Sequence, residues 1–197
     1  VQTMYGVNNQ HNIGNDVYTI SSFSSLDYIY ATIWDAGGVD AISWAGQSTR
    51  AFIDLQQGNY SNFGNIEYGV VDFDLEFGSN IAAGGGLLGI AYGTVIENAI
   101  GGSASDVISG NSAANTLYGG AGAGVQDVLA GGEGADIFVC SLSDASTSLS
   151  YTDIISDFTN GTDFIGLEDR SFSDLSFSNI SISGIGSGTQ IIDTDSN

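Results

Sequence analysis

The chain has 197 residues, 42% of them hydrophobic, which is enough to bury a core in one large domain or two merged ones. It carries 23 Asp and Glu residues against two arginines, for a formal charge of −21. This balance excludes nucleic acid and anionic membranes as partners, because both need a basic protein surface. No apolar run reaches the roughly eighteen residues of a membrane span, and no classical secretory leader is visible.

Residues 1–8 are expected to form an element separate from the main domain. The chain begins at Val1 without an initiator Met, which is typical of a fragment or a processed product. Residues 1–8 predict the end of a helix that closes on a glycine. We interpret them as the trailing helix of an absent catalytic domain or as an N-terminal extension, and expect the domain itself over residues 9–197.

Short strands are expected next. Segments rich in Tyr, Ile, Val and Trp are separated by Gly, Asn and Asp, and they predict strands at residues 17–20, 28–34, 40–46 and 51–55. Residues 70–78 alternate like a further strand, and the three glycines at 84–86 predict a loop.

A nine-residue repeat follows over residues 101–139. Its units are 101–109, 110–118, 119–130 and 131–139, and the third has a three-residue insertion. Each unit predicts a six-residue turn and a three-residue strand, with one inward apolar residue per strand. These residues are Ile108, Leu117, Leu129 and Phe138. Two units would make one coil of a parallel β-roll or β-helix.

The last third alternates apolar and polar residues at 151–167 and 171–184, which predicts half-buried antiparallel strands. The expected fold is therefore all-β, a parallel β-roll or β-helix with glycine-rich repeats and flanking antiparallel strands.

The repeat chemistry favours calcium, which takes six to eight oxygen ligands from carboxylates and backbone carbonyls. Glycine at the first, second and fourth positions lets carbonyls point to a common centre, and the sixth position adds a charge. The sixth positions are Asp106, Asn115, Asp127 and Asp136. The insertion before Asp127 should displace that carboxylate unless the loop bulges outward. A metal-free solenoid is the alternative, but its stacked carboxylates would repel one another.

A second acidic cluster lies upstream, where the run "WDAGGVDAISW" places Asp35 and Asp40 around Gly37 and Gly38. A simple β-turn accounts for one Asp there more readily than for two.

Four segments carry a resemblance to a known family. "VQTMYGVNN", "TIWDAGGVDAISWAG", "GTVIENAIGGSASDVISGN" and "DIISDFTNGTD" occur in family order, and the chain resembles the C-terminal calcium-binding RTX domain of serralysin-type zinc metalloproteases. The resemblance covers nearly the whole chain.

The resemblance implies several calcium sites. One would use Asn12, Gly14, Asp16, Asp35, Gly37 and Asp40, and a neighbouring ion would use Gly38, Asp40, the Val95 carbonyl and Glu97. In the repeats, Gly102, Ala104 and Asp106 would face Gly119, Ala121 and Asp127, and Asn111, Ala113 and Asn115 would pair with Gly131, Glu133 and Asp136. A further ion would join Gly120 and Gly122 to Asp153 or Asp163.

The family's protease activity is not expected in this chain. The zinc motif has the form HExxHxxGxxH, whereas His11 is the single histidine and lies in a polar run typical of a solvated loop. No zinc is therefore expected. The lone Cys140 has apolar neighbours, which favours a small buried hydrophobic residue over a reactive thiol.

The expected function is a calcium-binding module of a secreted bacterial metalloprotease, which folds outside the cell after type I export and supports the parent catalytic domain. One alternative is an RTX-type adhesin or polysaccharide-binding module, although the outward repeat positions Ser109, Tyr118, Ala130 and Val139 form no ladder of Thr or aromatic residues. Another is an appended lyase or lipase, for which one His and one Cys leave few catalytic options.

Overall fold

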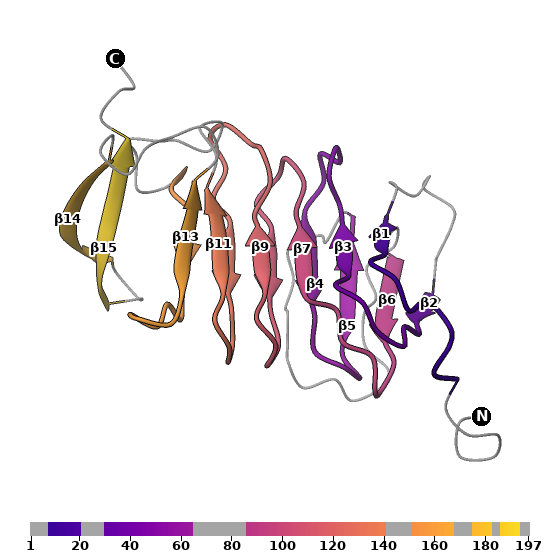
Figure 1. Ribbon diagram of the computed structural model, residues 1–197. Coiled ribbons are helices and arrows are strands. Elements are labelled where there is room, and N and C mark those ends of the chain that lie inside the picture. Colours follow the sequence, from indigo (N-terminus) through magenta and orange to yellow (C-terminus); the bar gives the residue numbers. More distant parts are fainter. Residues whose placement is uncertain are drawn as a thin grey trace.

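The computed structural model describes residues 8–20, 30–64, 86–140, 151–167, 175–182 and 186–193. These residues form fifteen strands in three sheets. Most of the strands stack side by side along one axis, with β1 and β2 near one end and the β14–β15 hairpin at the other (Figure 1). The prediction of an all-β fold is confirmed for this part of the chain.

A six-stranded sheet forms one wall of the roll. All its neighbouring strands are parallel. In spatial order it contains β1 (Val17–Thr19), β3 (Ala41–Ser43), β7 (Asn98–Ile100), β9 (Thr116–Tyr118), β11 (Ile137–Cys140) and β13 (Phe164–Leu167).

A seven-stranded sheet forms the other wall. Its strands are parallel except that β5 runs antiparallel to both β4 and β6. In spatial order it contains β12 (Ile154–Ile155), β10 (Val128–Ala130), β8 (Val107–Ser109), β4 (Ala51–Asp54), β5 (Tyr60–Phe63), β6 (Gly86–Ile90) and β2 (Tyr30–Ile33). The predicted strands in residues 17–55 are present, but β5 was not foreseen.

From β7 to β10 the chain alternates between the two walls, one three-residue strand at a time, and β11, β12 and β13 continue the alternation with strands of four, two and four residues. The middle residue of each strand from β7 to β10 is buried, and its neighbours are only partly buried. Ile108, Leu117, Leu129 and Phe138 are all 0–2% exposed, which confirms the predicted inward positions. Each such burial stabilises the fold by about 1.5–3 kcal/mol.

The two largest fully buried side chains lie where the regular coils meet the irregular N-terminal ones. Trp44 and Phe63 are buried there, with ring centroids 5.0 Å apart and planes tilted by 41°. The Trp44 indole nitrogen donates to the Thr49 carbonyl at 2.7 Å, so its polar atom is satisfied inside the core.

Two sequence predictions need correction. Residues 151–167 do not form antiparallel strands, because β12 pairs in parallel with β10, and β13 pairs in parallel with β11. They extend the roll by one more coil, since alternation marks a half-buried strand without fixing its direction. Gly86 belongs to β6 and not to a loop.

The antiparallel prediction holds further on, where β14 (Leu175–Ile182) pairs with β15 (Gly186–Asp193). The predicted helix end at residues 1–8, apart from Asn8, and the predicted strand at 70–78 lie outside the described residues.

Candidate metal centre

Turns connect the two walls along two rims of the roll. The first rim holds the turns that lead into the six-stranded sheet, and the second rim holds those that lead into β4, β8, β10 and β12. The residue immediately before each strand, here called the pre-strand residue, is acidic in most turns. The pre-strand residues are Asp16, Asp40, Glu97, Asn115, Asp136 and Asp163 on the first rim, and Arg50, Asp106, Asp127 and Asp153 on the second.

These side chains link successive coils in a regular way. The backbone N–H of one pre-strand residue donates to the carboxylate of the next coil, as from Asp106 to Asp127 at 2.7 Å and from Asp127 to Asp153 at 2.8 Å. The first rim repeats the pattern between Asp16 and Asp40, Asp40 and Glu97, Asn115 and Asp136, and Asp136 and Asp163, at 2.8–3.1 Å. Each rim is therefore a ladder of acidic groups with one oxygen held by the backbone.

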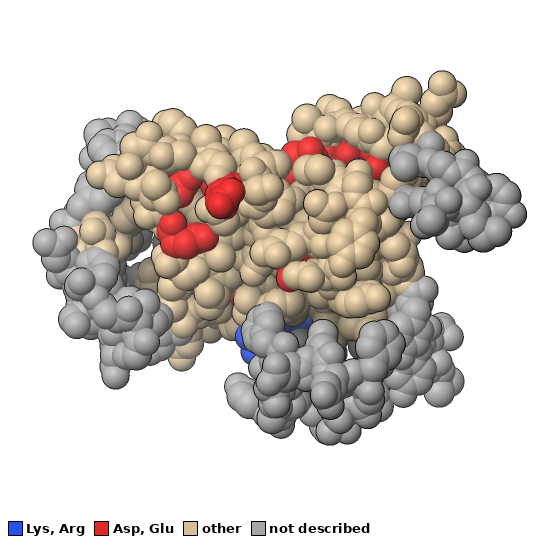
Figure 2. All heavy atoms as spheres, turned by 90° about the horizontal axis from the view of Figure 1, so that it is seen from below, with Lys and Arg blue, Asp and Glu red and all other residues tan. Residues whose placement is uncertain are grey.

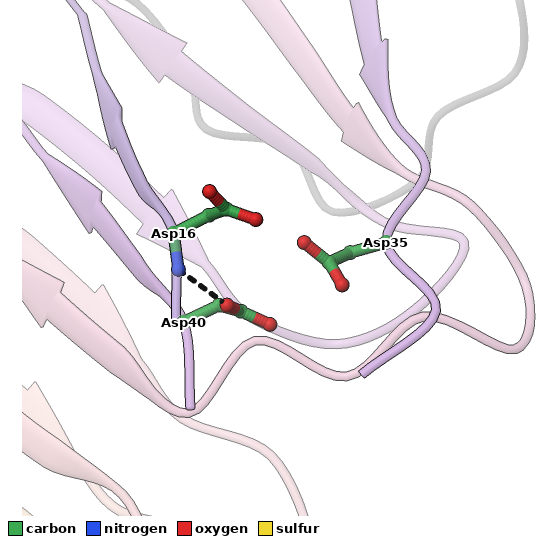
Figure 3. A group of neighbouring side chains, drawn as sticks. All are labelled: Asp16, Asp35 and Asp40. Atoms are coloured by element: carbon green, nitrogen blue, oxygen red, sulfur yellow. Dashed lines mark hydrogen bonds between the residues drawn. The ribbon is translucent and has the colours of Figure 1, made fainter. Parts of the chain in front are cut away.

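At the N-terminal end of the first rim, three carboxylates converge. Asp16, Asp35 and Asp40 each offer an oxygen atom, and these atoms all lie within 4.8 Å of one another. Figure 3 shows the side chains pointing toward a common space, with the Asp16 N–H bound to Asp40. Asp35 and Asp40 are at most 1% exposed, so their charges are not screened by bulk water.

The glycines between Asp35 and Asp40 are required by the backbone. Gly37 and Gly38 have φ of 144° and 149°, values that L side chains rarely adopt. A Cβ on Gly38 would overlap the carbonyl oxygen of Gly14, so this close approach of the two turns needs glycine. The structure thus brings Gly14, Asp16, Asp35, Gly37 and Asp40 together, as the resemblance implied.

Asn12 contacts this centre through both its backbone and its side chain. Its carbonyl accepts a hydrogen bond from the Ala36 N–H at 3.2 Å, and its side-chain amide donates to the Tyr18 hydroxyl at 3.0 Å. Tyr18 in turn donates to Asp35 Oδ2 at 2.5 Å. Sequence reasoning missed Tyr18, because an inward tyrosine in a strand has no feature that separates it from core residues.

The second implied site adjoins the first. The Asp40 N–H donates to Glu97 Oε2 at 2.8 Å, which places the turn of residues 91–97 directly against that of residues 34–40. Asp40 Oδ2 is buried and has no hydrogen-bond partner. Burial raises the pKa of Asp40, and the nearby carboxylates of Asp35, Glu97 and Asp16 raise it further, against a backbone hydrogen bond from Asp16 that lowers it.

On the second rim, the implied sets around Asp106 and Asp127 lie on adjacent turns. A Cβ on Gly120 would overlap the Gly102 carbonyl oxygen, and one on Gly101 would overlap that of Gly119. Burial raises the pKa of Asp106 to about 6, although N–H groups of Ala51 and Gly102 and the charge of Arg50 act in the opposite direction. Ala104 and Ala121 lie in the same two turns.

The insertion in the third repeat leaves the ladder intact. Asp127 is 2% exposed and accepts from the Asp106 N–H, so its carboxylate is not displaced. The extra residues bulge instead, through Gly124 with φ of 78°, and the Gln126 amide donates to the Thr152 carbonyl at 2.7 Å. The inserted loop thus bulges outward, which is the arrangement under which the Asp127 carboxylate was expected to keep its place.

On the first rim, the turns of residues 110–115 and 131–136 also stack closely. Cβ atoms on Gly132 and Gly134 would overlap the carbonyl oxygens of Asn111 and Ala113. Asp136 Oδ2 is buried without a hydrogen-bond partner. Its pKa is raised by burial first and by the charges of Asp163 and Asp157 after that, against a backbone hydrogen bond from Asn115. Gly131 and Glu133 belong to this turn, and the Glu133 side chain is exposed.

Asp153 and Asp163, the alternative ligands for an ion at Gly120 and Gly122, belong to different rims. Asp153 stacks on the turn that holds Gly120 and Gly122, whereas Asp163 stacks on Asp136 across the roll. The sequence also missed Asp157, which binds the N–H groups of Gly131 and Gly132 at 2.9 and 2.8 Å. The two oxygens of Asp157 therefore hold the turn that begins at Gly131.

One interface of the first rim is closed by amides. The Asn111 side-chain nitrogen donates to the carbonyls of Leu55 at 3.1 Å and Ile96 at 2.8 Å. The Asn115 side-chain nitrogen donates to the Glu97 carbonyl at 2.9 Å. We call this contact, between the turn of residues 110–115 and the carbonyls of Leu55, Ile96 and Glu97, the amide layer. In this layer the backbone carbonyls accept hydrogen bonds from side-chain N–H groups that carry no net charge.

The donor atoms of these turns fit a hard cation. Carboxylate and carbonyl oxygens suit calcium, whereas soft metals prefer Cys and His. His11 is exposed, and Cys140 lies on β11, outside the turns described above. Figure 2 shows acidic atoms in separate groups on this face, with uncharged surface between them. No helix in the described ranges is long and apolar enough to cross a membrane.

Comparison with known proteins agrees with this geometry. The family described as peptidase M10 serralysin C terminal matches residues 1–194. Serralysin of Proteus mirabilis is 35% identical over 126 residues, which cover 59% of this chain and 22% of the relative. Serralysin G of Dickeya chrysanthemi is 37% identical over 126 residues, covering 59% and 23%. Metallopeptidase AprA of Pseudomonas marginalis is 35% identical over the same length, also covering 59% and 23%. The chain thus matches under a quarter of these relatives' length.

Proposed function

Because the chain belongs to the family of serralysin C-terminal domains of peptidase M10, we propose that it is a calcium-binding β-roll module of a secreted serralysin-like metalloprotease. In this proposal it folds when it binds calcium after type I export, and it stabilises the parent enzyme. The module extends over residues 9–197, and the catalytic domain precedes it.

The observation that carries the calcium proposal is a pair of buried carboxylate oxygens without partners. Asp40 Oδ2 and Asp136 Oδ2 are both inaccessible and unbonded, and both carboxyl groups have raised pKa values. Burying an uncompensated charge costs several kcal/mol, so native structures pair such groups or place them on a metal. A divalent cation at each turn interface removes this cost.

The ligands are presented by the stacked turns. The pre-strand carboxylates supply charge, and the glycine-rich turns bring backbone carbonyls close to the neighbouring coil. Calcium, when bound, supplies the positive charge that holds these oxygens together. The assigned ligand sets are those implied by the resemblance, with Asp153 assigned to Gly120 and Gly122 and Asp163 assigned to the turn of Asp136.

The proposed switch follows from charge and chain entropy. At cytosolic calcium, a chain of charge −21 with 29 glycines is self-repelling and loses much entropy on folding. An open chain is suited to export through a type I channel. Outside the cell, calcium in the range of extracellular modules neutralises the carboxylates, and binding free energy becomes folding free energy.

We propose no catalytic role for this chain. A single histidine, His11, cannot supply the three histidines of the zinc motif HExxHxxGxxH. Proteolysis is assigned to the parent's catalytic domain, and the module contributes stability to it.

The direct test is a calcium titration followed by far-UV circular dichroism, with magnesium as the control and a chelator to reverse the change. A cooperative increase of β-sheet signal with calcium alone is the expected result. A spectrum that is fully folded in chelator and unchanged by calcium would contradict the folding switch and favour the metal-free solenoid.

A further inference from the structure

The metal centre of Asp16, Asp35 and Asp40 has an additional polar neighbour, the hydroxyl of Tyr18. Tyr18 is the middle residue of β1, and its partly buried ring packs against the core. Its hydroxyl donates to Asp35 Oδ2 at 2.5 Å. The other oxygen of Asp35 accepts from the Gly37 N–H at 2.9 Å. Each oxygen of this carboxylate is thus held by one donor, and the two donors come from different elements.

The direction of the Tyr18 hydroxyl is fixed by Asn12. The Asn12 amide donates to the phenol oxygen at 3.0 Å, which leaves the single hydroxyl proton for Asp35. A phenol keeps its proton at neutral pH, so this hydroxyl can donate to Asp35. Asn12, Tyr18 and Asp35 form a chain of donors that ends on a carboxylate of the metal centre.

We propose that Tyr18 is the positioning residue of this centre: its hydroxyl, oriented by Asn12, holds the Asp35 carboxylate in the orientation in which the cation binds it. This inference rests on the proposed calcium function. It gives the side chain of Asn12 a role in addition to the place of this residue in the proposed ligand set.

The physical reason lies in the repulsion among three carboxylates. Their oxygens lie within 4.8 Å of one another, and without a donor the Asp35 side chain would turn away from the other two. A charge-assisted hydrogen bond opposes that rotation, and each bonded oxygen still has a lone pair for a cation. Groups that orient metal ligands in this way change metal affinity by about 10–100-fold when removed.

The test is Tyr18→Phe in the full chain, which removes the hydroxyl and keeps the ring. Hydrogen exchange is measured by mass spectrometry at a series of free calcium concentrations. Peptides covering Asp35–Asp40 report this centre, and peptides covering residues 119–130 report the repeats. Tyr92→Phe is the matched control, because Tyr92 is 74% exposed and outside the ligand sets.

We expect the calcium midpoint of the Asp35–Asp40 peptides to rise about 10–100-fold in Tyr18→Phe, with the midpoint of the repeat peptides unchanged. Asn12→Gly, which suits the φ of 49° at that residue, should shift the same midpoint less. The double variant should equal Tyr18→Phe alone, because both changes act through one hydroxyl.

Two results would overturn the inference. In the first, the midpoint does not change and protection falls equally at every calcium concentration, as expected if Tyr18 only fills the core. In the second, the two single variants are additive. If wild-type protection does not respond to calcium in any peptide, the proposed function itself fails, and this outcome is distinct from both.

Discussion

The two faces of a single turn, residues 110–115, close onto their neighbours by different means. On one side, Asn111 and Asn115 donate amide hydrogens to the Ile96 and Glu97 carbonyls of the turn of residues 91–97, and Asn111 also donates to the Leu55 carbonyl. Toward the turn of residues 131–136, the contact includes Asp136 with one buried oxygen that has no partner. The amide layer is formed by uncharged groups, whereas the contact with Asp136 is one at which we propose a cation.

This difference predicts a seam in the roll that does not depend on calcium. On the second rim, direct hydrogen bonds also join the neighbouring turns in this region: the Ser103 N–H donates to the Gln47 carbonyl at 2.8 Å, and the Ala51 N–H donates to the Asp106 carboxylate at 2.6 Å. The buried Trp44 and Phe63 pack nearby. The acidic ladders continue on both sides of this seam, so calcium dependence should be concentrated toward the ends.

The largest expected effect comes from calcium removal. In chelator, the coils that hold Asp16 to Asp40 and Asp127 to Asp163 should lose hydrogen-exchange protection, because their carboxylates repel. Residues 51–55 and 96–109 should retain more protection. Exchange mass spectrometry with magnesium as the control measures both sets. Uniform loss along the whole roll would refute the seam.

Asp136→Asn should have opposite effects in the two conditions. In chelator the substitution removes an unpaired buried charge and should raise the midpoint of thermal unfolding. In calcium it removes a charged ligand and should lower the midpoint. The corresponding loss in the free energy of unfolding should be about 1–3 kcal/mol. Thermal unfolding with and without calcium measures the sign. A change of the same sign in both conditions would show that no cation binds there.

Asn111→Ala is the matched change on the other face of the same turn. It deletes the two hydrogen bonds that the Asn111 amide donates to the Leu55 and Ile96 carbonyls. It also deletes the two that its side-chain oxygen accepts from the Ala113 N–H and the Asn115 amide, and the combined loss should cost about 1–2 kcal/mol. The cost should be the same in calcium and in chelator, because the layer is held by amides alone. Denaturant unfolding measures both values, and a loss seen only in calcium would contradict this assignment.

The smallest expected effect is a pH dependence of the seam in chelator. The folded pKa of Asp106, about 6, lies above its ordinary value of 3.8, so the folded state binds more protons between these values. Its contribution to stability is therefore greatest below pH 4 and is lost as the pH rises through about 6. Exchange protection of residues 51–55, corrected for intrinsic rates, should be higher at pH 5 than at pH 7, and Asp106→Asn should flatten the difference.

The ligand sets of the repeats show how far spacing alone can predict a site. The nine-residue period identified the turns and the inward residues Ile108 and Leu117, because one buried side chain per short strand is visible in the sequence. Spacing did not decide which rim Asp153 or Asp163 joins, because that depends on how many times the chain crosses the roll between them.

The sequence by itself determined the all-β class, the coil period, the family and the acidic, glycine-rich turns, since each depends on residues close together in the chain. Only the tertiary structure decided that residues 151–167 continue the parallel roll, that Tyr18 binds Asp35, and that Asn111 reaches Leu55 and Ile96. These contacts join residues far apart in the chain. The local sequence specifies which side chains and backbone groups a turn presents. The stacking of the coils decides which residues of the neighbouring turns those groups contact.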